Sequence, residues 1–317
     1  MHFFLFFCGG MAALAWLYLL VAHGGFWQVS KSLPSLKAAK TPARVVAVVP
    51  ARNEADGIAR SIPSLLTQSD LLHVFLVDDG STDGTAQMAR EAAQKAGRPA
   101  SLTIIEGRPL PPGWSGKLWA VRQGVEQASS LAPDFFLLTD ADTFHAPENV
   151  STLVAIAESG NFDLASLMVK LHCGNFAEKL LVPAFVFFFF KLYPPSWIAD
   201  PRRSTAGAAG GCILVRPQAL AQAGGIEAIR NQIIDDCALA RRVKRAGGRV
   251  WLGLASSASS LRPYGSFGEI GRMISRTAFN QLRHSAALLA MALLGLTLIY
   301  LAPVALSFSG YPPAIAL

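Results

Sequence analysis

Short apolar runs alternate with helix-patterned segments over residues 44–138. Four continuous apolar runs are typical of strands buried on both faces: Arg44–Val49, His73–Val77, Leu102–Ile105 and Phe135–Leu138. Residues 58–66 carry apolar side chains at helical spacing, and Leu118–Ala128 also has a helical pattern. This order of strands and helices predicts an α/β fold with a doubly wound, mainly parallel sheet.

The second half of the chain has a less regular pattern. Cys212–Val215 and Arg249–Leu254 are predicted strands, and Asp236–Ala246 is a predicted helix rich in basic residues. The segment Leu180–Leu192 contains VFFFFKL and is too short to span a bilayer. Its pattern fits both a core helix and a helix in the headgroup layer. The amphipathic segment Phe267–Arg283 is expected to lie on a membrane surface.

Two long apolar stretches flank this region. Phe3–Val21 is uncharged and close to the roughly 20 residues that cross a bilayer. Its start lacks Lys and Arg, and no small-residue cleavage site precedes Gly24, which favours an uncleaved anchor over a signal peptide. Ala286–Phe308 is the second expected span. Basic residues follow the first span and precede the second, which places the region between them on the cytoplasmic side.

The patterns divide the chain into five parts. We expect an N-terminal transmembrane anchor at residues 1–30, a basic linker at 31–43, an α/β domain at 44–265, an amphipathic interfacial helix at 266–285 and a C-terminal transmembrane segment at 286–317. The last residues, SGYPPAIAL, leave open whether a further apolar segment begins there.

The composition agrees with membrane association. Of the 317 residues, 52% are hydrophobic and only 15% are charged, against roughly 25% charged in soluble domains. The net charge is +7, and the basic residues lie beside apolar segments rather than among aromatic ones. This distribution favours an anionic membrane surface over nucleic acid as the partner. The four cysteines lack ligand spacing, so we expect reduced thiols and neither a zinc site nor a disulfide framework.

Polar residues follow three of the predicted strands directly. Pro50–Glu54, Asp78–Asp79 and Asp140–Asp142 all lie at carboxyl ends, where ligands of doubly wound sheets bind. Asp79 before Gly80 suits a hydrogen bond to a ribose or base, although both are also ordinary turn residues. The stretch GWSGK at Gly113–Lys117 does not have the phosphate-loop spacing, and no GxGxxG is present. A P-loop NTPase and a nicotinamide-dependent dehydrogenase are therefore disfavoured.

Two acidic pairs carry the candidate chemistry. Asp140 and Asp142 at a strand end suit a hard cation such as Mg²⁺ or Mn²⁺, which binds carboxylates together with substrate phosphates. Such a metal would neutralise a diphosphate leaving group. Asp235 and Asp236 open a predicted helix, where acidic residues also favour the helix dipole. The alternative is a general base that takes a proton from a hydroxyl, and the pattern alone leaves both open.

The order of these motifs resembles inverting family-2 glycosyltransferases of the GT-A fold. The chain has PxRNE, VDDGSTDGT, a Gly-Lys before a helix, DxD, a Gly-Gly strand and an acidic pair in that family's order, across Arg44–Ser285. Three stretches resemble hopene-associated glycosyltransferases of bacterial hopanoid biosynthesis more narrowly: Pro109–Ala120, Glu178–Pro195 and Arg276–Ser285.

The resemblance implies roles for individual residues. The expected uridine contacts are Pro50, Arg52, Glu54 and Asp79, with Lys117 on the nucleotide side. Asp140 would lie near the ribose, the diphosphate and the metal, Asp142 would ligate the metal, and Asp236 would be the catalytic base supported by Asp235.

A last motif departs from the family pattern. Asn280–His284 is similar to Q(Q/R)xRW but has Asn and His at its two ends, which argues against processive synthesis. Arg283 is its expected contact with the diphosphate.

The resemblance also implies a reaction. We expect transfer of a sugar from a UDP-sugar to a lipid hydroxyl, with inversion and a divalent metal, at the bacterial inner membrane with the catalytic domain facing the cytoplasm. The acceptor would be a hopanoid or another polycyclic or polyprenyl lipid. Sugar transfer to polyprenyl phosphate is the alternative, and a non-catalytic nucleotide-binding membrane scaffold is the alternative of another class. A nucleotidyltransferase would not need the acidic pair at Asp235–Asp236 or the segment around Arg283.

Overall fold

The computed structural model describes residues 2–29 and 43–308. Nearly all of the predicted linker 31–43 and the residues after 308 therefore lie outside the described part of the chain. The first half alternates strands and helices as expected: β1 (Val45–Ala51), α2 (Ala55–Leu66), β2 (Leu71–Asp78), α3 (Thr85–Lys95), η2 (Pro99–Ser101), β3 (Leu102–Glu106), α4 (Gly116–Ala128), η3 (Ser129–Leu131) and β4 (Phe135–Leu138).

The second half contains more elements than its sequence pattern predicts. They are β5 (Thr143–His145), α5 (Asn149–Ser159), β6 (Leu164–Lys170), α6 (Phe176–Leu192), α7 (Pro195–Ala199), β7 (Ile213–Val215), α8 (Pro217–Gln222), η4 (Ile226–Ile229), α9 (Asp235–Arg245), β8 (Val250–Ser260) and α10 (Phe267–Gln281). The chain then continues through α11 (Ala286–Leu296), the π-helical turn η5 (Thr297–Leu301) and α12 (Ala302–Ser307).

All eight described strands form one sheet in the order β3-β2-β1-β4-β7-β6-β8-β5. Strands β3, β2, β1 and β4 are parallel, as predicted, and β6 is parallel to β8. The prediction of a mainly parallel sheet is wrong for the other half, because β7 runs antiparallel to both β4 and β6, and β5 runs antiparallel to β8. The sheet is therefore mixed, with a parallel half formed by β3, β2, β1 and β4.

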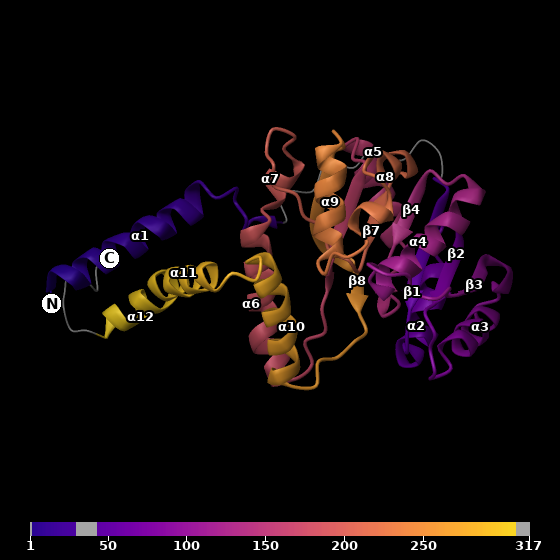
Figure 1. The fold of residues 1–317 in the computed structure, drawn as a ribbon, viewed down its shortest axis with the longest axis horizontal. Helices are drawn as coiled ribbons and strands as arrows, with labels where there is room; N and C mark the ends of the chain where they lie inside the picture. Colours follow the sequence, from indigo (N-terminus) through magenta and orange to yellow (C-terminus); the bar gives the residue numbers. More distant parts are fainter. Residues whose placement is uncertain (1, 30–42, 309–317) are drawn as a thin grey trace.

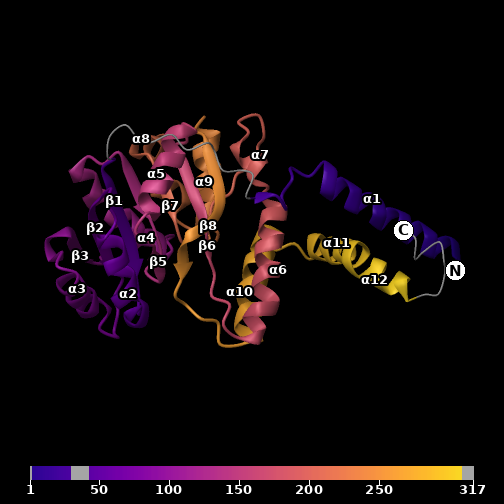
Figure 2. The ribbon, with the colours of Figure 1, turned by 180° about the vertical axis from the view of Figure 1, so that it is seen from behind.

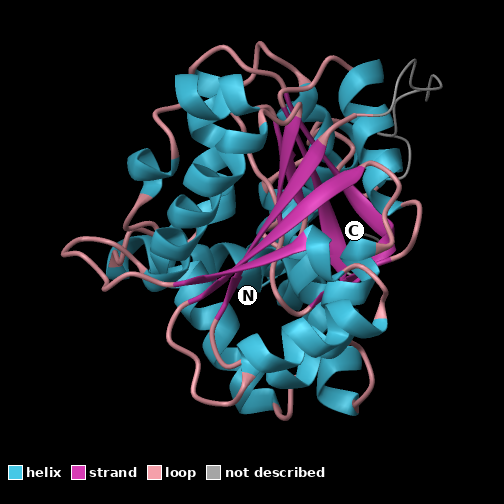
Figure 3. Ribbon diagram, turned by 90° about the vertical axis from the view of Figure 1, so that its right-hand side faces the viewer, coloured by secondary structure: helices cyan, strands magenta, loops and turns pink. Residues whose placement is uncertain are grey.

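Helices cover both faces of the twisted sheet (Figure 3). Alternate residues of β1 point to opposite faces, so Val45, Ala47 and Val49 pack against α2, α3 and α5, whereas Val46 and Val48 pack with α4 and α9. Gly124 lets α4 approach β1 closely, since a Cβ there would lie 2.4 Å from Cγ1 of Val48. The doubly wound arrangement is thus confirmed, and it directs the carboxyl ends of β1, β2 and β4 to one edge.

Helices α6 and α10 pack side by side, next to the domain (Figures 1 and 2). Most apolar side chains of α6 remain partly exposed, including Leu180 at 55% and Leu192 at 58%, so α6 is not a core helix. The predicted amphipathic helix is present as α10 and ends at Gln281. Arg283 and His284 follow with positive φ, which breaks the helix before α11.

One carboxylate joins the segments that lead into α6 and α10. The side chain of Glu178 is completely buried and accepts hydrogen bonds from the backbone N–H groups of Gly174 (2.7 Å), Asn175 (3.0 Å) and Tyr264 (2.6 Å), and from Nδ1 of His172 (2.9 Å). Burial alone would raise the pKa of Glu178, but these hydrogen bonds outweigh it and lower the pKa to about 2.

The substitution Glu178→Ala is expected to destabilise the domain. It would leave three part-buried backbone N–H groups without this acceptor, and an unpaired donor carries a desolvation cost to the extent that water does not reach it. Thermal unfolding of the purified chain should show a Tm lower by several degrees. Glu158→Ala, at an exposed position on α5, serves as the matched control. Equal Tm values for the two variants would contradict this role of Glu178.

The apolar helices at the two ends of the chain lie side by side away from the domain (Figure 1). Ala286–Ser307 is the one described helix long and apolar enough to cross a membrane, with 22 residues and a mean hydropathy of 2.2. Helix α1 (His2–Val21) packs on it, and Nε1 of Trp16 donates to the carbonyl of Ile299 at 2.9 Å. The described apolar stretch of α1, Phe6–Val21, is shorter than a full span, so the N-terminal anchor stays a prediction.

Candidate active site

The loops after β1 and β2 are cross-linked at the carboxyl edge of the sheet. Asn53 adopts a positive φ of 56°, and its Oδ1 accepts from the N–H of Thr82 at 2.9 Å. The N–H of Glu54 donates to Oγ1 of Thr85 at 2.9 Å. The two motifs that the sequence places at neighbouring strand ends therefore form one rigid rim.

Asp79 lies at this rim, where a nucleotide would bind. Its Oδ2 is 3.5 Å from Nη1 of Arg52, and 18% of its side-chain surface is exposed. The carboxylate also lies against the first residue of α4, because a Cβ on Gly116 would be 2.8 Å from Oδ2 of Asp79. Glycine at 116 therefore makes room for the Asp79 carboxylate beside the start of α4.

Lys117 connects the two acidic pairs. Its Nζ lies 2.8 Å from Oδ1 of Asp140 and 3.4 Å from Oδ2 of Asp235. Desolvation would lower the pKa of Lys117, but the charges of Asp140, Asp235 and Asp236 outweigh it and raise the pKa. Since 42% of its side-chain surface remains accessible, the ammonium group is a permanent cation within reach of a ligand.

Asp236 is held by the backbone at both oxygens. Its Oδ2 accepts from the N–H of Gly210 at 2.9 Å, and its Oδ1 accepts from the N–H of Cys237 at 2.6 Å. Burial, followed by repulsion from Asp235, raises the pKa of Asp236 to about 6. A carboxylate with a pKa near neutral is suited to accept a proton from a substrate hydroxyl.

Hydrogen bonds of the preceding residue, Thr139, hold the turn that carries Asp140. The hydroxyl of Thr139 donates to the carbonyl of Gly211 at 2.7 Å and lies 3.0 Å from Nε2 of His145. Nε2–H of His145 is therefore the donor to Thr139, and its Nδ1 accepts from Nδ2 of Asn149 at 2.9 Å. Burial lowers the pKa of His145 to about 4, so this histidine stays neutral and structural.

Asp142 lies at the junction of β5 and β8. Oγ of Ser260 donates to Oδ2 of Asp142 at 3.3 Å, and Glu54 and Arg262 line the same cavity of about 370 Å³. Burial and the charge of Asp142 raise the pKa of Glu54, while burial and Asp140 raise the pKa of Asp142. The acids Glu54, Asp56 and Asp142 share this cavity with the arginines Arg52, Arg60 and Arg262, so acidic and basic groups are balanced there.

The neighbouring carboxylates of Glu54 and Asp142 are the candidate ligands for a divalent cation. Among residues 2–29 and 43–308, no three Asp, Glu, His or Cys side chains are grouped to hold a metal by themselves. Mg²⁺ and Mn²⁺ sites that use one or two carboxylates complete their shell with substrate phosphates and water. The donor set around Asp142 meets that requirement, whereas Oδ1 of Asp140 is already engaged by Lys117.

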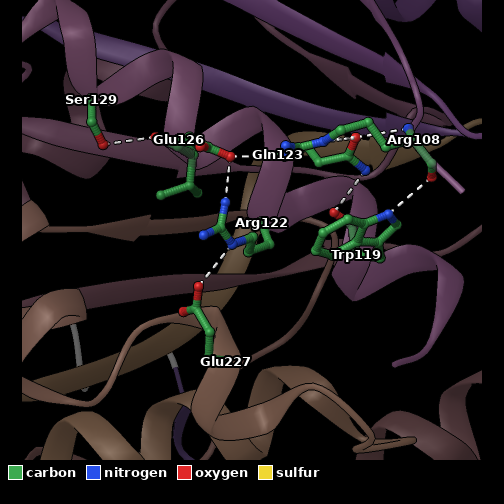
Figure 4. A network of polar contacts seen from close by, with 8 residues as sticks. Arg108, Trp119, Arg122, Gln123, Glu126, Ser129 and Glu227 are labelled. Atoms are coloured by element: carbon green, nitrogen blue, oxygen red, sulfur yellow. Dashed lines mark hydrogen bonds and ion pairs between the residues drawn. The ribbon is translucent and has the colours of Figure 1, made fainter. Parts of the chain in front are cut away.

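A polar network fixes the helix that carries Lys117 (Figure 4). Arg122 on α4 pairs with Glu126 and, at 2.8 Å, with Glu227 of η4. Arg108, in the loop before α4, donates to Gln123 at 3.1 Å and to Glu126 at 2.8 Å. These contacts bind α4 to the loop in front of it and to the segment that precedes the acidic pair.

Two spaces meet at Asp235 and Asp236. The first, at the end of the strands, is lined by Pro50, Lys117, Asp140 and Gly210 together with both acids. The second is an apolar groove of about 250 Å³ between α6 and α10, which we call the acceptor groove. Its lining residues are Phe185, Phe188, Phe189, Leu192, Ile233, Ile234, Asp235, Asp236, Ile274, Thr277, Ala278 and Gln281. The first space is small, about 30 Å³, and apart from Lys117, Asp140 and the acids most of its lining is apolar, so the acid pair borders two spaces of different size.

The structure brings together all but one of the predicted site residues. Arg283 lies apart, because it lines another cavity with Arg241 and Arg245 and lines neither space next to Asp140. Its predicted contact with the diphosphate stays a prediction. Sequence reasoning gave no role to Gly210, Ser260 or Arg262, although the Gly-Gly pair at 210–211 was a signal for close backbone approach.

Sequence relatives and one solved structure show similarity to glycosyltransferases. The chain is 33% identical over 121 residues to an undecaprenyl-phosphate 4-deoxy-4-formamido-L-arabinose transferase of Pseudomonas savastanoi pv. phaseolicola, covering 36% of this chain and 32% of that one. It is 42% identical over 117 residues to the succinoglycan biosynthesis protein ExoU of Rhizobium meliloti, covering 37% and 31%. These matches span about a third of the length of the relatives.

The fold has a solved counterpart. The mannosyltransferase PcManGT from Pyrobaculum calidifontis, solved with GDP-Man and Mn²⁺, superposes with a TM-score of 0.57 at 20% identity, covering 98% of this chain and 89% of that one. At this identity the likeness concerns the fold alone, a mixed α/β sheet like that of GT-A glycosyltransferases. The model of glycosyl transferase family 2 matches residues 46–223, more than half of the chain. The chain therefore belongs to glycosyl transferase family 2 and is a glycosyltransferase.

Proposed function

We propose that this glycosyltransferase moves a sugar from a UDP-sugar to the hydroxyl of a membrane lipid at the cytoplasmic face of a bacterial inner membrane. The observation that carries the proposal is the position of Asp235 and Asp236. Both lie beside Lys117 and Asp140 at the end of the strands, and both line the acceptor groove. A donor on one side and a lipid on the other would meet at this acid pair.

The residues divide the work between the two substrates. Asp79 and Arg52 would bind the nucleoside, and Lys117 would face the diphosphate next to Asp140. Asp142, with Glu54 in the same cavity and Asp140 close enough to raise the pKa of both, would hold Mg²⁺ or Mn²⁺, which when bound would neutralise charge on the diphosphate. The acceptor groove would bind the hydrocarbon part of the lipid, because its walls on α6 and α10 are mainly apolar.

The transfer step then follows from the position of the base. Asp236 takes the proton of the acceptor hydroxyl while the oxygen of that hydroxyl attacks the anomeric carbon of the donor sugar. The bond from that carbon to the diphosphate oxygen breaks, and UDP leaves with the electron pair. A single displacement inverts the anomeric carbon, so an α-linked donor gives a β-glycoside. The raised pKa of Asp236 supports this role, because a stronger base removes a hydroxyl proton more readily.

The alternative acceptor is polyprenyl phosphate. Relatives named as undecaprenyl-phosphate sugar transferases favour it, although they match over only about a third of their length. A phosphate acceptor is already an anion and needs no base. The enclosed, backbone-held Asp236 with its pKa near 6 therefore favours a hydroxyl acceptor. Among hydroxyl lipids, the sequence resemblance favours a hopanoid. Its rigid apolar ring system suits the aromatic walls of the acceptor groove.

A product assay tests the proposal directly. Purified full-length chain in detergent is incubated with a panel of UDP-sugars, Mn²⁺ and either a total bacterial lipid extract or undecaprenyl phosphate. Mass spectrometry of the lipids should show one hexose added to a neutral hydroxyl lipid. Products formed only from undecaprenyl phosphate would establish the alternative. UDP binding without any lipid product or donor hydrolysis would favour a non-catalytic scaffold.

The pH dependence of transfer is expected to report Asp236. With a pKa of about 6, Asp236 is protonated and inactive at lower pH, so kcat/KM should rise as the pH increases through about 6. Asp235→Asn removes a neighbouring negative charge, which lowers the pKa of Asp236 and moves the acidic limb to lower pH. Asp56→Asn, at an exposed position on α2 and outside both spaces that Asp236 lines, should leave the limb in place. An unmoved limb in Asp235→Asn would contradict this assignment.

A further inference from the structure

A separate cavity of about 960 Å³ lies between α9, the loop after α7 and the end of α10. Six of its lining side chains are basic, and we call this group the cationic basin: Arg202, Arg203, Arg241, Lys244, Arg245 and Arg283. No carboxylate is among the residues that line it. The mechanism proposed above uses neither this cavity nor most of these side chains.

Half of these cations already have partners. Nζ of Lys244 donates to the backbone carbonyls of Trp197, Ile198 and Thr205 at 2.6–3.0 Å, so Lys244 is structural. Arg202 pairs with Asp200 at 3.0 Å, and Arg203 lies over the ring of Trp197.

The other three cations line the basin without a counter-charge. In the part of the chain that the structure describes, the guanidinium groups of Arg241, Arg245 and Arg283 have no carboxylate within 4.0 Å. Like charges around a shared cavity repel one another, and a bound anion would offset that repulsion. The planar guanidinium group of arginine can donate two hydrogen bonds to one phosphate, so phosphate is the anion that suits this cavity.

The place of the cationic basin indicates where the phosphate comes from. The basin is lined at the end of α10 by Gln281, Arg283 and His284. These residues directly precede the apolar helix that begins at Ala286. Figure 1 shows α7, α9 and the end of α10 on the side of the domain from which α11 leaves. The basin also shares Ile234 and Gln281 with the acceptor groove. Apolar surface beside a phosphate-binding cavity suits a lipid rather than a soluble phosphate.

A phosphate in the cationic basin would lie away from the reacting atoms. Along α9, Arg241 is five residues and Arg245 nine residues beyond Asp236, which corresponds to about 7 Å and about 13 Å of helix. An anion held between the two arginines is therefore not the nucleophile. We propose that the cationic basin binds the phosphate headgroup of an anionic bilayer lipid, which docks the domain on the membrane. The inference rests on the membrane attachment in the proposed function and not on the sugar transfer.

Native mass spectrometry of the full-length chain in neutral detergent tests this site. Dioleoyl phosphatidylglycerol and dioleoyl phosphatidylcholine are titrated separately, and inorganic phosphate is added as a competitor. Phosphatidylglycerol should bind in preference to phosphatidylcholine. The double variant Arg241→Gln/Arg245→Gln should weaken its retention about 30-fold, as expected for two basic residues at a membrane surface. Arg90→Gln/Lys95→Gln on the distant helix α3 removes the same charge as a control.

Each other outcome overturns the proposal. Both lipids contain a phosphate, so equal retention would show that the net negative charge of an anionic headgroup is not recognised. Unchanged binding in Arg241→Gln/Arg245→Gln would place the lipid elsewhere. Displacement of the lipid by micromolar inorganic phosphate would make the ligand a free phosphate. The measurement involves no sugar transfer, so its failure is distinguishable from a failure of the proposed activity, and an unchanged Tm of the variant confirms folding.

Discussion

Replacing Asp236 by Asn is expected to lower kcat about 10²- to 10⁴-fold with a hydroxyl acceptor, the usual contribution of a positioned general base. The reason is that Asn keeps the shape of the side chain but does not accept a proton. Donor binding should change less than kcat, because the substitution leaves Lys117 and its ion pair with Asp140 in place. The measurement is steady-state transfer at saturating UDP-sugar, with thermal unfolding to verify the fold.

Asp235→Asn is the matched control for this experiment. It removes one negative charge from the same helix start but leaves the backbone-held Asp236 in place. We expect a loss of less than about tenfold at a pH above the acidic limb, since the charge is removed without the base. Full activity of Asp236→Asn on a hydroxyl lipid would show that Asp236 is not the base. Activity retained only with undecaprenyl phosphate would identify an anionic acceptor.

Replacing Asp142 by Asn is expected to remove metal-dependent turnover, with a loss of at least about 100-fold in kcat/KM. Asp142 and Glu54 are neighbouring carboxylates in one cavity, and Asn would remove one of these two candidate ligands. Electron paramagnetic resonance of Mn²⁺ in the presence of UDP gives a readout that is independent of catalysis. It should show weaker Mn²⁺ binding in the variant.

Asp56→Asn separates a ligand effect from a general charge effect. Asp56 lines the same cavity but is exposed on α2, so its loss should change Mn²⁺ affinity only slightly. Equal effects of Asp56→Asn and Asp142→Asn would mean that the cavity attracts cations without a specific ligand. Metal-dependent activity retained in Asp142→Asn would remove Asp142 from the metal site.

The parallel half of the sheet was predictable because its strands are continuous apolar runs that are buried on both faces. The other half was predictable only in part. Strands β7 and β8 match the predicted strands Cys212–Val215 and Arg249–Leu254, whereas β6 and the three-residue β5 were not predicted, and the antiparallel directions come from pairing with distant strands. The position of β7 between β4 and β6 also requires the chain to return across the sheet after α6 and α7. No local pattern encodes such a return.

The residues of the candidate site were also predictable only in part. Carboxylates at strand ends, such as Asp79 and Asp142, are readable because parallel strands deliver their carboxyl ends to one edge. Gly210 and Arg262 reach the site through tertiary packing, without a motif of their own that specifies a contact. Arg283 was assigned to the diphosphate, but two non-glycine residues with positive φ end α10 just there, and a sequence pattern does not reveal such a break.

That break between α10 and α11 has a consequence for how substrates are chosen. Positive φ at Arg283 and His284 makes the chain turn a corner between a surface helix and the apolar helix that follows. If the apolar helix is inserted in the bilayer, this corner would fix the distance between Asp236 and the hydrocarbon core. Lipids would then be selected by how far their reactive oxygen projects from the bilayer, in addition to the shape of their apolar part.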